Sequence, residues 1–304
     1  MLIRIGLFEI TECWDGVFYK KLSRYPQISV WEIQTVLDFI NYEESNGRTC
    51  EIEAEKEIID AIEQYRPTYD RGIRIRPPRK IEECRACPGH KGCMTDYVCH
   101  TSSAENAVKI LECGSLLSPV RARNMSAAEL QKEARNAAND PEDYFEYIML
   151  AWGNCQAGDR LVMERKLSRF PDEKDLSEGF TPGIRFFFRY DDLIRHPGAV
   201  FEGVLPLKIR DEVILDDWVS AIIVPEIHRQ QVEPAVPEKL KSRVHFLQND
   251  CKDIWEWSEK VYEYIKKQDL YLRQKELLDT FLEHGTISRA QYDKFWTGTR
   301  HAHW

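Results

Sequence analysis

Residues 97–119 form a short unit whose order of apolar and polar residues predicts two secondary-structure elements and the turn between them. Its apolar start predicts a strand, and Ser102 or Ser103 is a suitable N-cap for the segment that follows. That segment, Ala104–Glu112, predicts a helix, and Gly114 fits the left-handed position at which many helices end. A strand joined directly to a capped helix requires a fold that mixes both structures.

Periodic segments elsewhere in the chain support the same fold class. Val30–Glu44 and Ile52–Tyr65 carry apolar residues at helical spacing and predict two helices. Gly183–Tyr190, in which isoleucine and phenylalanine alternate with other residues, and Val219–Val224 predict strands. We therefore expect an α+β fold with a central mixed β-sheet.

Changes of composition along the chain predict three parts. Residues 1–80 are expected to form an N-terminal strand and helical segment. Residues 81–248 begin at a cysteine-rich junction and continue into an α+β domain. Residues 249–304 read as a helical tail, because apolar residues follow one helix face and charged residues the other.

Composition bounds the partners that the chain can have. Its 304 residues are 43% hydrophobic and 31% charged, which is ordinary for a globular protein. The net charge of −9 gives no general attraction to nucleic acid or to anionic lipid. The sequence shows no signal peptide and no apolar run of the roughly 18 residues that span a membrane, so we expect a soluble, cytoplasmic protein without a membrane partner.

Cysteines gather just before the strand at residue 97. Of the nine in the chain, Cys84, Cys87 and Cys93 could supply three thiolates to one tetrahedral zinc ion, with His90 or Cys99 as the fourth ligand. An iron–sulfur cluster would use similar thiolates, and reduced free cysteines or redox chemistry are the other interpretations. A disulfide framework is not expected in a reducing compartment.

The segment from Tyr97 to Pro119 resembles the opening of the ADP-ribosyltransferase fold, in which a strand ending in His-Thr or His-Gly leads into a helix and then Gly-x-Leu. The resemblance implies an ADP-ribosyltransferase-like central domain that binds NAD and transfers ADP-ribose to an unknown acceptor, with nucleic acid left open as an acceptor. In that family the histidine hydrogen-bonds the nicotinamide ribose and the next residue's backbone holds the carboxamide. Carried over, His100, Thr101 and Ser102 would contact the cofactor.

The same resemblance implies further site residues on later strands. Arg185 could pair with the pyrophosphate, and Tyr190 stands in the strand that would supply an aromatic contact. The family places a catalytic glutamate near the start of a late strand. Here Asp217 precedes that strand and Glu226 follows it, so either is a candidate for the carboxylate that stabilises an oxocarbenium-like transition state.

Residues 274–294 resemble the short C-terminal helical pair of the SHOCT type, which is appended to many bacterial proteins. Such tails look like interaction modules, so a protein partner could bind there, while a plain helical hairpin is an equally good interpretation. The polar stretch Lys266–Asp269 is expected to separate this pair from the preceding helix. The alternative function for the whole chain is a non-enzymatic interaction protein with a structural zinc knuckle.

Overall fold

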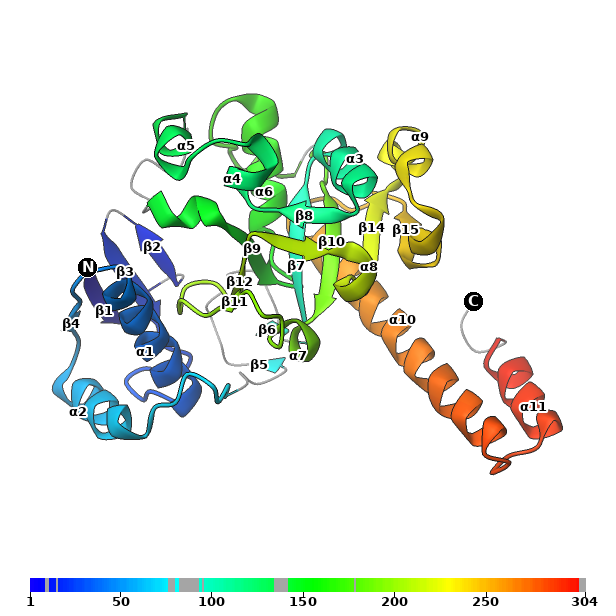
Figure 1. Ribbon diagram of the computed structural model, residues 1–304, viewed down its shortest axis with the longest axis horizontal. Coiled ribbons are helices and arrows are strands. Elements are labelled where there is room, and N and C mark those ends of the chain that lie inside the picture. Colours follow the sequence, from blue (N-terminus) through cyan, green and yellow to red (C-terminus); the bar gives the residue numbers. More distant parts are fainter. Residues whose placement is uncertain are drawn as a thin grey trace. The chain divides into compact units, whose positions relative to one another are not determined.

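A computed structural model describes residues 1–8, 11–14, 16–75, 80–81, 93–94, 96–133, 142–177 and 179–300 (Figure 1). The chain divides into two compact units, residues 1–258 and residues 259–304. It is a mixed α+β protein, as the sequence predicts. The finer domain boundaries expected at residues 80 and 248 stay predictions.

The N-terminal part of the first unit is a small sheet packed against helices. Its strands, in the order β2-β3-β1-β4, are β1 (Leu2–Gly6), β2 (Glu12–Trp14), β3 (Val17–Lys21) and β4 (Glu51–Glu53). The helices are α1 (Val30–Ser45), α2 (Lys56–Tyr65) and the 3-10 turn η1 (Arg66–Thr68). Phe18 of β3 stacks on Phe39 of α1 with ring centroids 4.4 Å apart, so α1 covers this sheet.

The first predicted helix is confirmed, whereas the second begins later than predicted. Ser29 and Glu32 form a capping box at the start of α1, in which the Ser29 N–H donates to a Glu32 carboxylate oxygen at 2.9 Å. Residues 51–53 belong instead to β4, which pairs in parallel with Leu2–Arg4 of β1. Tertiary pairing therefore decides the conformation of this short segment.

The central part is built on a seven-stranded mixed sheet among the described residues, in the order β11-β12-β9-β7-β10-β14-β15. These strands are β7 (Tyr97–Ser102), β9 (Tyr147–Trp152), β10 (Ile184–Arg189), β11 (Ala199–Val200), β12 (Leu207–Arg210), β14 (Ala221–Pro225) and β15 (Val244–Leu247). Two-stranded ladders join β8 (Ser115–Leu117) to β13 (Glu212–Ile214) and β5 (Lys80–Ile81) to β6 (Cys93–Met94).

Helices cover this sheet on both faces, which explains why the first five residues of β10 are all buried. The α-helices are α3 (Ala104–Cys113), α4 (Pro119–Arg123), α5 (Ala127–Glu133), α6 (Ala157–Leu167), α7 (Tyr190–Leu193), α8 (Leu215–Trp218) and α9 (Arg229–Val232). The 3-10 turns are η2 (Glu142–Glu146), η3 (Glu226–His228), η4 (Glu233–Ala235) and η5 (Glu238–Arg243). Ala107 and Leu111 of α3 join the core that contains Phe186, Phe188 and Ile222.

The predicted strand–helix unit is confirmed. The Ser103 side chain accepts from the Asn106 N–H at 3.3 Å and caps α3. Gly114 ends the helix at φ 77°, a conformation that glycine adopts without steric penalty. The strands predicted at 183–190 and 219–224 are β10 and β14.

Strand β9 divides its pairing between two neighbours. Its residues from Tyr147 to Leu150 pair with β12, and only Ala151 and Trp152 pair with β7. Strand β7, by contrast, pairs with β10 along all six of its residues. The pairing between β7 and β9 therefore stops at Cys99, and the last three residues of β7 pair with β10 alone.

The second unit contains most of α10 (Ile254–Glu283) and all of α11 (Arg289–Arg300). The expected break at Lys266–Asp269 is wrong, since α10 continues through it. The segment lacks glycine and proline, so nothing in it opposes helix formation. The Tyr292 hydroxyl donates to Asp279 and joins the two helices. Among the described helices, none is long and apolar enough to cross a membrane.

Candidate functional site

His100 lies in the second half of β7, where pairing with β9 has ended. It stands opposite Phe186 in the register with β10, and its Nδ1 is 3.3 Å from the Met149 carbonyl oxygen of β9. A carbonyl can only accept, so Nδ1 carries the proton of this hydrogen bond and Nε2 of the neutral ring is an acceptor. Burial lowers the pKa of His100, and the nearby positive charge of Arg165 lowers it further, which keeps the ring neutral near pH 7.

Thr101 and Ser102 are enclosed by the elements around β7. A Cβ placed on Gly158 of α6 would lie 2.4 Å from the Thr101 Cβ, and one placed on Gly183 would lie 2.7 Å from its Cγ2. Both glycines are therefore needed for α6 and β10 to approach the strand this closely. Ser102 is buried and stands opposite Ile184. The contact expected of Thr101 would consequently come from its backbone.

Arg185 forms a buried ion pair inside the protein. Its side chain and that of Asp159 are both 0% exposed, and the Arg185 Nε donates to Asp159 Oδ2 at 2.9 Å. The Arg185 guanidinium also donates to Ser258, and Asp159 Oδ1 accepts from the Gly183 N–H at 2.7 Å. A bond to pyrophosphate would require this buried pair to be broken, so the predicted role of Arg185 gains no support from its surroundings.

Tyr190 lies at the other end of the sheet from Ser102. It follows the last residue of β10, Arg189, which stands opposite the first residue of β7, Tyr97. Four residues of strand, about 13 Å, separate it from the row that contains His100. Its buried ring packs against Trp152 with centroids 5.0 Å apart. The structure therefore does not bring Tyr190 and His100 together.

The two candidate carboxylates lie at opposite ends of β14. Strands β7 and β14 both run antiparallel to β10, so the end of β14 lies at the same sheet edge as Ser102. Glu226 follows that end, whereas Asp217 precedes the strand. Glu226 forms an ion pair with Arg229 at 2.6 Å, which lowers the pKa of its carboxyl. In the described part of the chain, neither carboxylate forms a hydrogen bond or an ion pair with His100.

Two basic residues that the sequence reasoning missed lie near this edge. The His228 Nε2 is 3.2 Å from the Pro182 carbonyl oxygen, and burial lowers the pKa of this ring. Arg165 stands seven residues after Gly158 on α6, which places both on one helix face at about 100° per residue. No usable sequence signal marks Arg165, because the close approach of Gly158 to Thr101 is a tertiary contact.

The predicted zinc site falls mostly outside the described residues. This holds for Cys84, Cys87, His90 and the side chain of Cys93. Cys99 is described: it is buried, with its Sγ 3.7 Å from the Trp152 carbonyl oxygen, and burial raises the pKa of its thiol to about 12. In the part of the chain that is described, no group of three or more metal-binding side chains is found. Elemental analysis for zinc tests this prediction.

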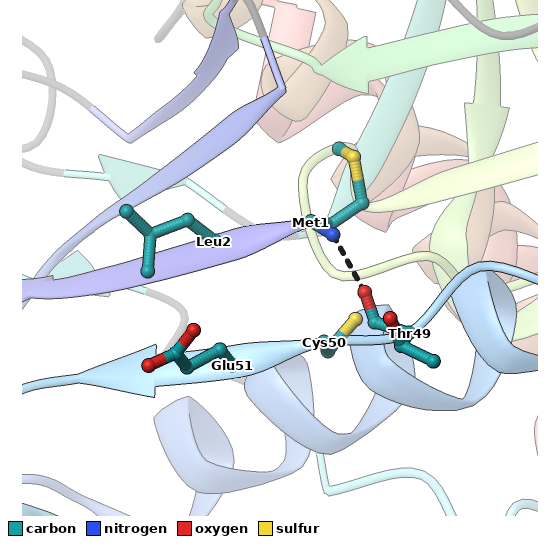
Figure 2. Close-up of a pocket in the computed structure, with 5 residues that line it drawn as sticks. All are labelled: Met1, Leu2, Thr49, Cys50 and Glu51. Atoms are coloured by element: carbon teal, nitrogen blue, oxygen red, sulfur yellow. Dashed lines mark hydrogen bonds between the residues drawn. The ribbon is translucent and has the colours of Figure 1, made fainter.

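An open pocket lies away from all of these residues. It is lined by Met1, Leu2, Thr49, Cys50 and Glu51 at the edge between β1 and β4 (Figure 2). The Met1 amino group donates to the Thr49 carbonyl oxygen at 2.6 Å across it. None of the predicted site residues lines this pocket.

Comparison with known proteins adds no name to this geometry, because no family model, no curated protein and no solved structure matches the chain.

Proposed function

We propose that the central sheet binds NAD at the end of β7 and transfers ADP-ribose, as an ADP-ribosyltransferase-like enzyme. The observation that carries the proposal is the position of His100. At His100 the backbone of β7 no longer pairs with β9, although the side-chain Nδ1 donates to the Met149 carbonyl of β9. The Nε2 atom is then available to accept a hydrogen bond from a ribose hydroxyl. A neutral imidazole suits this role, because it accepts from a hydroxyl without adding charge.

The reaction would need a carboxylate at the same edge, and Glu226 fits better than Asp217. When the bond between the ribose C1′ and nicotinamide breaks, nicotinamide leaves with the bonding electrons and positive charge develops on the ribose. A carboxylate stabilises that charge. The acceptor nucleophile then bonds to C1′ and loses its proton to a base. Glu226 would have to exchange its ion pair with Arg229 for the ribose, which is feasible for a partly exposed pair.

Arg165 is a better partner for the pyrophosphate than Arg185. It is exposed, it lies close enough to His100 to influence its charge, and it shares a helix face with the glycine that touches Thr101. A guanidinium can bind a phosphate through two parallel hydrogen bonds. Arg160 on the same helix is also exposed but points about 160° away from Gly158, so it serves as a matched control.

Thermal melting with increasing NAD tests the proposal. A ligand at 100 times its Kd stabilises the folded state by about 2.7 kcal/mol, which raises Tm by several degrees. His100→Ala and Arg165→Ala should weaken this shift, while Arg160→Ala should leave it unchanged. ADP-ribose tests whether binding needs the nicotinamide ring. A wild-type protein whose Tm does not respond to millimolar NAD contradicts the proposal.

Release of nicotinamide, followed by chromatography, tests catalysis separately. Glu226→Gln keeps the shape of the side chain and removes its charge, so it should retain the NAD-dependent Tm shift and lose turnover. Asp217→Asn should retain both. The opposite result would move the catalytic role to Asp217.

A further inference from the structure

Lys208 of β12 is a fully buried lysine enclosed by aromatic rings. Its side chain is 0% exposed, and its Nζ lies 3.2 Å from the ring centroid of Tyr144. Two further rings, those of Tyr42 and Tyr147, have centroids at 4.7 and 5.6 Å. Ring faces attract a cation, most strongly where water is excluded. We call Lys208 and these three tyrosines the lysine cage.

A buried carboxylate completes the surroundings of the cage. Glu202 is 1% exposed at its side chain, and its Oε2 lies 3.8 Å from the Lys208 Nζ. The Tyr144 hydroxyl donates to the same oxygen at 3.5 Å, and the Leu205 N–H donates to Oε1 at 2.5 Å. Enclosing two charges costs free energy unless their geometry is well fixed, so the cage constrains the segments that contribute to it.

The cage joins three segments that are distant in sequence. Tyr42 comes from α1 of the N-terminal part, Tyr144 and Tyr147 come from η2 and the start of β9, and Lys208 comes from β12. Gly203 makes a second close contact with α1, because a Cβ placed there would lie 2.0 Å from the Thr35 carbonyl oxygen. The N-terminal part is thus packed tightly against the β9–β12 half of the sheet.

Met149 connects the lysine cage to His100. Lys208 stands directly opposite Met149 in the register between β12 and β9. The carbonyl of Met149 is the group that binds the His100 Nδ1. A displacement of β9 relative to β7 would therefore be felt at the His100 ring, since these strands share only two paired positions.

We infer that Lys208 is a positioning residue for the proposed nucleotide site: by fixing β12 and β9 against α1, the lysine cage sets the Met149 carbonyl that orients His100. This inference rests on the proposed NAD site for its functional meaning, but the orientation of His100 can be measured without any nucleotide. The role belongs to the cage as a whole, because Lys208 itself is fully enclosed and can act on His100 only through its neighbour Met149.

The experiment removes both buried charges together, because removing one would leave the other uncompensated. In Lys208→Met/Glu202→Gln we expect the NMR signal of the His100 Nδ1–H to move and broaden, because the Met149 carbonyl that accepts its hydrogen bond is no longer held in place. NAD affinity should fall on the order of tenfold, the equivalent of one hydrogen bond.

Ile62→Val is the matched control, because it lowers stability from the core of the N-terminal part without touching the cage. It should leave the signal of the His100 Nδ1–H and the NAD affinity unchanged, and His100→Gln assigns the resonance. If the double variant does not fold, Tyr144→Leu removes the nearest ring and is read in the same way.

The outcomes separate the two proposals. A folded variant in which the signal of the His100 Nδ1–H stays as in the wild type overturns the inference. A changed signal in a protein whose wild type binds no NAD supports the positioning role and rejects the proposed function. A changed signal with unchanged NAD affinity also overturns the inference, because the ring would then not need to be positioned.

Discussion

Two ion pairs among the described residues have both side chains fully buried, and they are built differently. Arg185 donates hydrogen bonds to Asp159 and to Ser258. The other oxygen of Asp159 accepts from the Gly183 N–H. Lys208 lies 3.8 Å from Glu202 and is surrounded by rings instead. Guanidinium is a planar fork that matches a carboxylate, whereas ammonium is a point charge that a ring face can receive.

The difference concerns how strictly each pair depends on its charges. Both oxygens of the Asp159 carboxylate accept hydrogen bonds, Oδ1 from the Gly183 N–H and Oδ2 from Arg185, so loss of Arg185 removes the donors to Oδ2 of a fully buried group. Glu202 is different, because burial raises the pKa of its carboxyl and a proton can replace the missing cation. The arginine pair should therefore be the more costly of the two to break, and the predictions below run from the largest expected effect to the smallest.

Arg185→Met should reduce the free energy of unfolding by about 3–5 kcal/mol, the usual cost of removing one partner from a buried pair. Urea unfolding followed by circular dichroism measures it. Arg169→Ala, which breaks the partly exposed pair with Asp175, is the control and should change stability by less than about 1 kcal/mol. If Arg185→Met were as mild as this control, the contrast between the two buried pairs would be lost.

Gly203→Ala should lower the free energy of unfolding by about 2–3 kcal/mol, because the substitution adds both backbone strain and a steric clash beside the lysine cage. Gly203 has φ 78°, and the added Cβ would meet the Thr35 carbonyl oxygen of α1. Gly47→Ala isolates the backbone part of this effect, since Gly47 has φ 77° and open space around its Cα. Equal losses in the two variants would show that the contact between residue 203 and α1 is not tight.

The stability that Glu202 contributes should depend on pH in the direction opposite to that of an ordinary ion-paired carboxylate. Its pKa is raised in the folded state, so the folded protein holds this proton more firmly than the unfolded chain. The contribution is complete below the unfolded pKa of about 4.3 and is lost as pH rises through the folded pKa.

Unfolding of wild type and Lys208→Met/Glu202→Gln across pH 4 to 8 measures this dependence, because the double variant leaves neither buried charge uncompensated. The stability of the wild type relative to the variant should decrease as the pH rises, by about 1.4 kcal/mol for each unit of pKa shift. A relative stability that increases with pH would mean that Lys208 holds Glu202 ionised, and the two buried pairs would then be alike.

The sequence predicts the local parts of this fold better than its charged interior. The β7–α3 unit, β10 and β14 were predictable because capping, glycine position and alternation are local signals. The short strand β4 was not, because its conformation comes from pairing with β1. Charged residues are usually exposed, so sequence alone favours ligand contact for Arg185 and gives no reason to notice Lys208.

The candidate site was predicted in part for the same reason. His100 was proposed because its neighbours in sequence carry a recognisable pattern. The Met149 carbonyl and Arg165, which act on its ring, lie 49 and 65 residues further along the chain. Which end of β14 faces the histidine likewise depends on strand direction, which favours Glu226 over Asp217 only once the sheet is known.

Deletion of residues 270–304 should have the smallest effect, because it leaves both buried pairs intact. Ser258, which binds the Arg185 guanidinium, lies in the first turns of α10 and within the first unit, so the truncation preserves it. The helical pair that is removed belongs to the second unit and contains the Tyr292–Asp279 contact. We expect the unfolding free energy of the remainder to change by less than about 0.5 kcal/mol, as for changes away from a core. Differential scanning calorimetry measures it, and any response of Tm to NAD should persist.

Ser258→Ala in the full chain is the comparison, since it removes one bond from the arginine pair and should cost about 1–3 kcal/mol. A truncated protein less stable than Ser258→Ala would show that the C-terminal helices support the first unit.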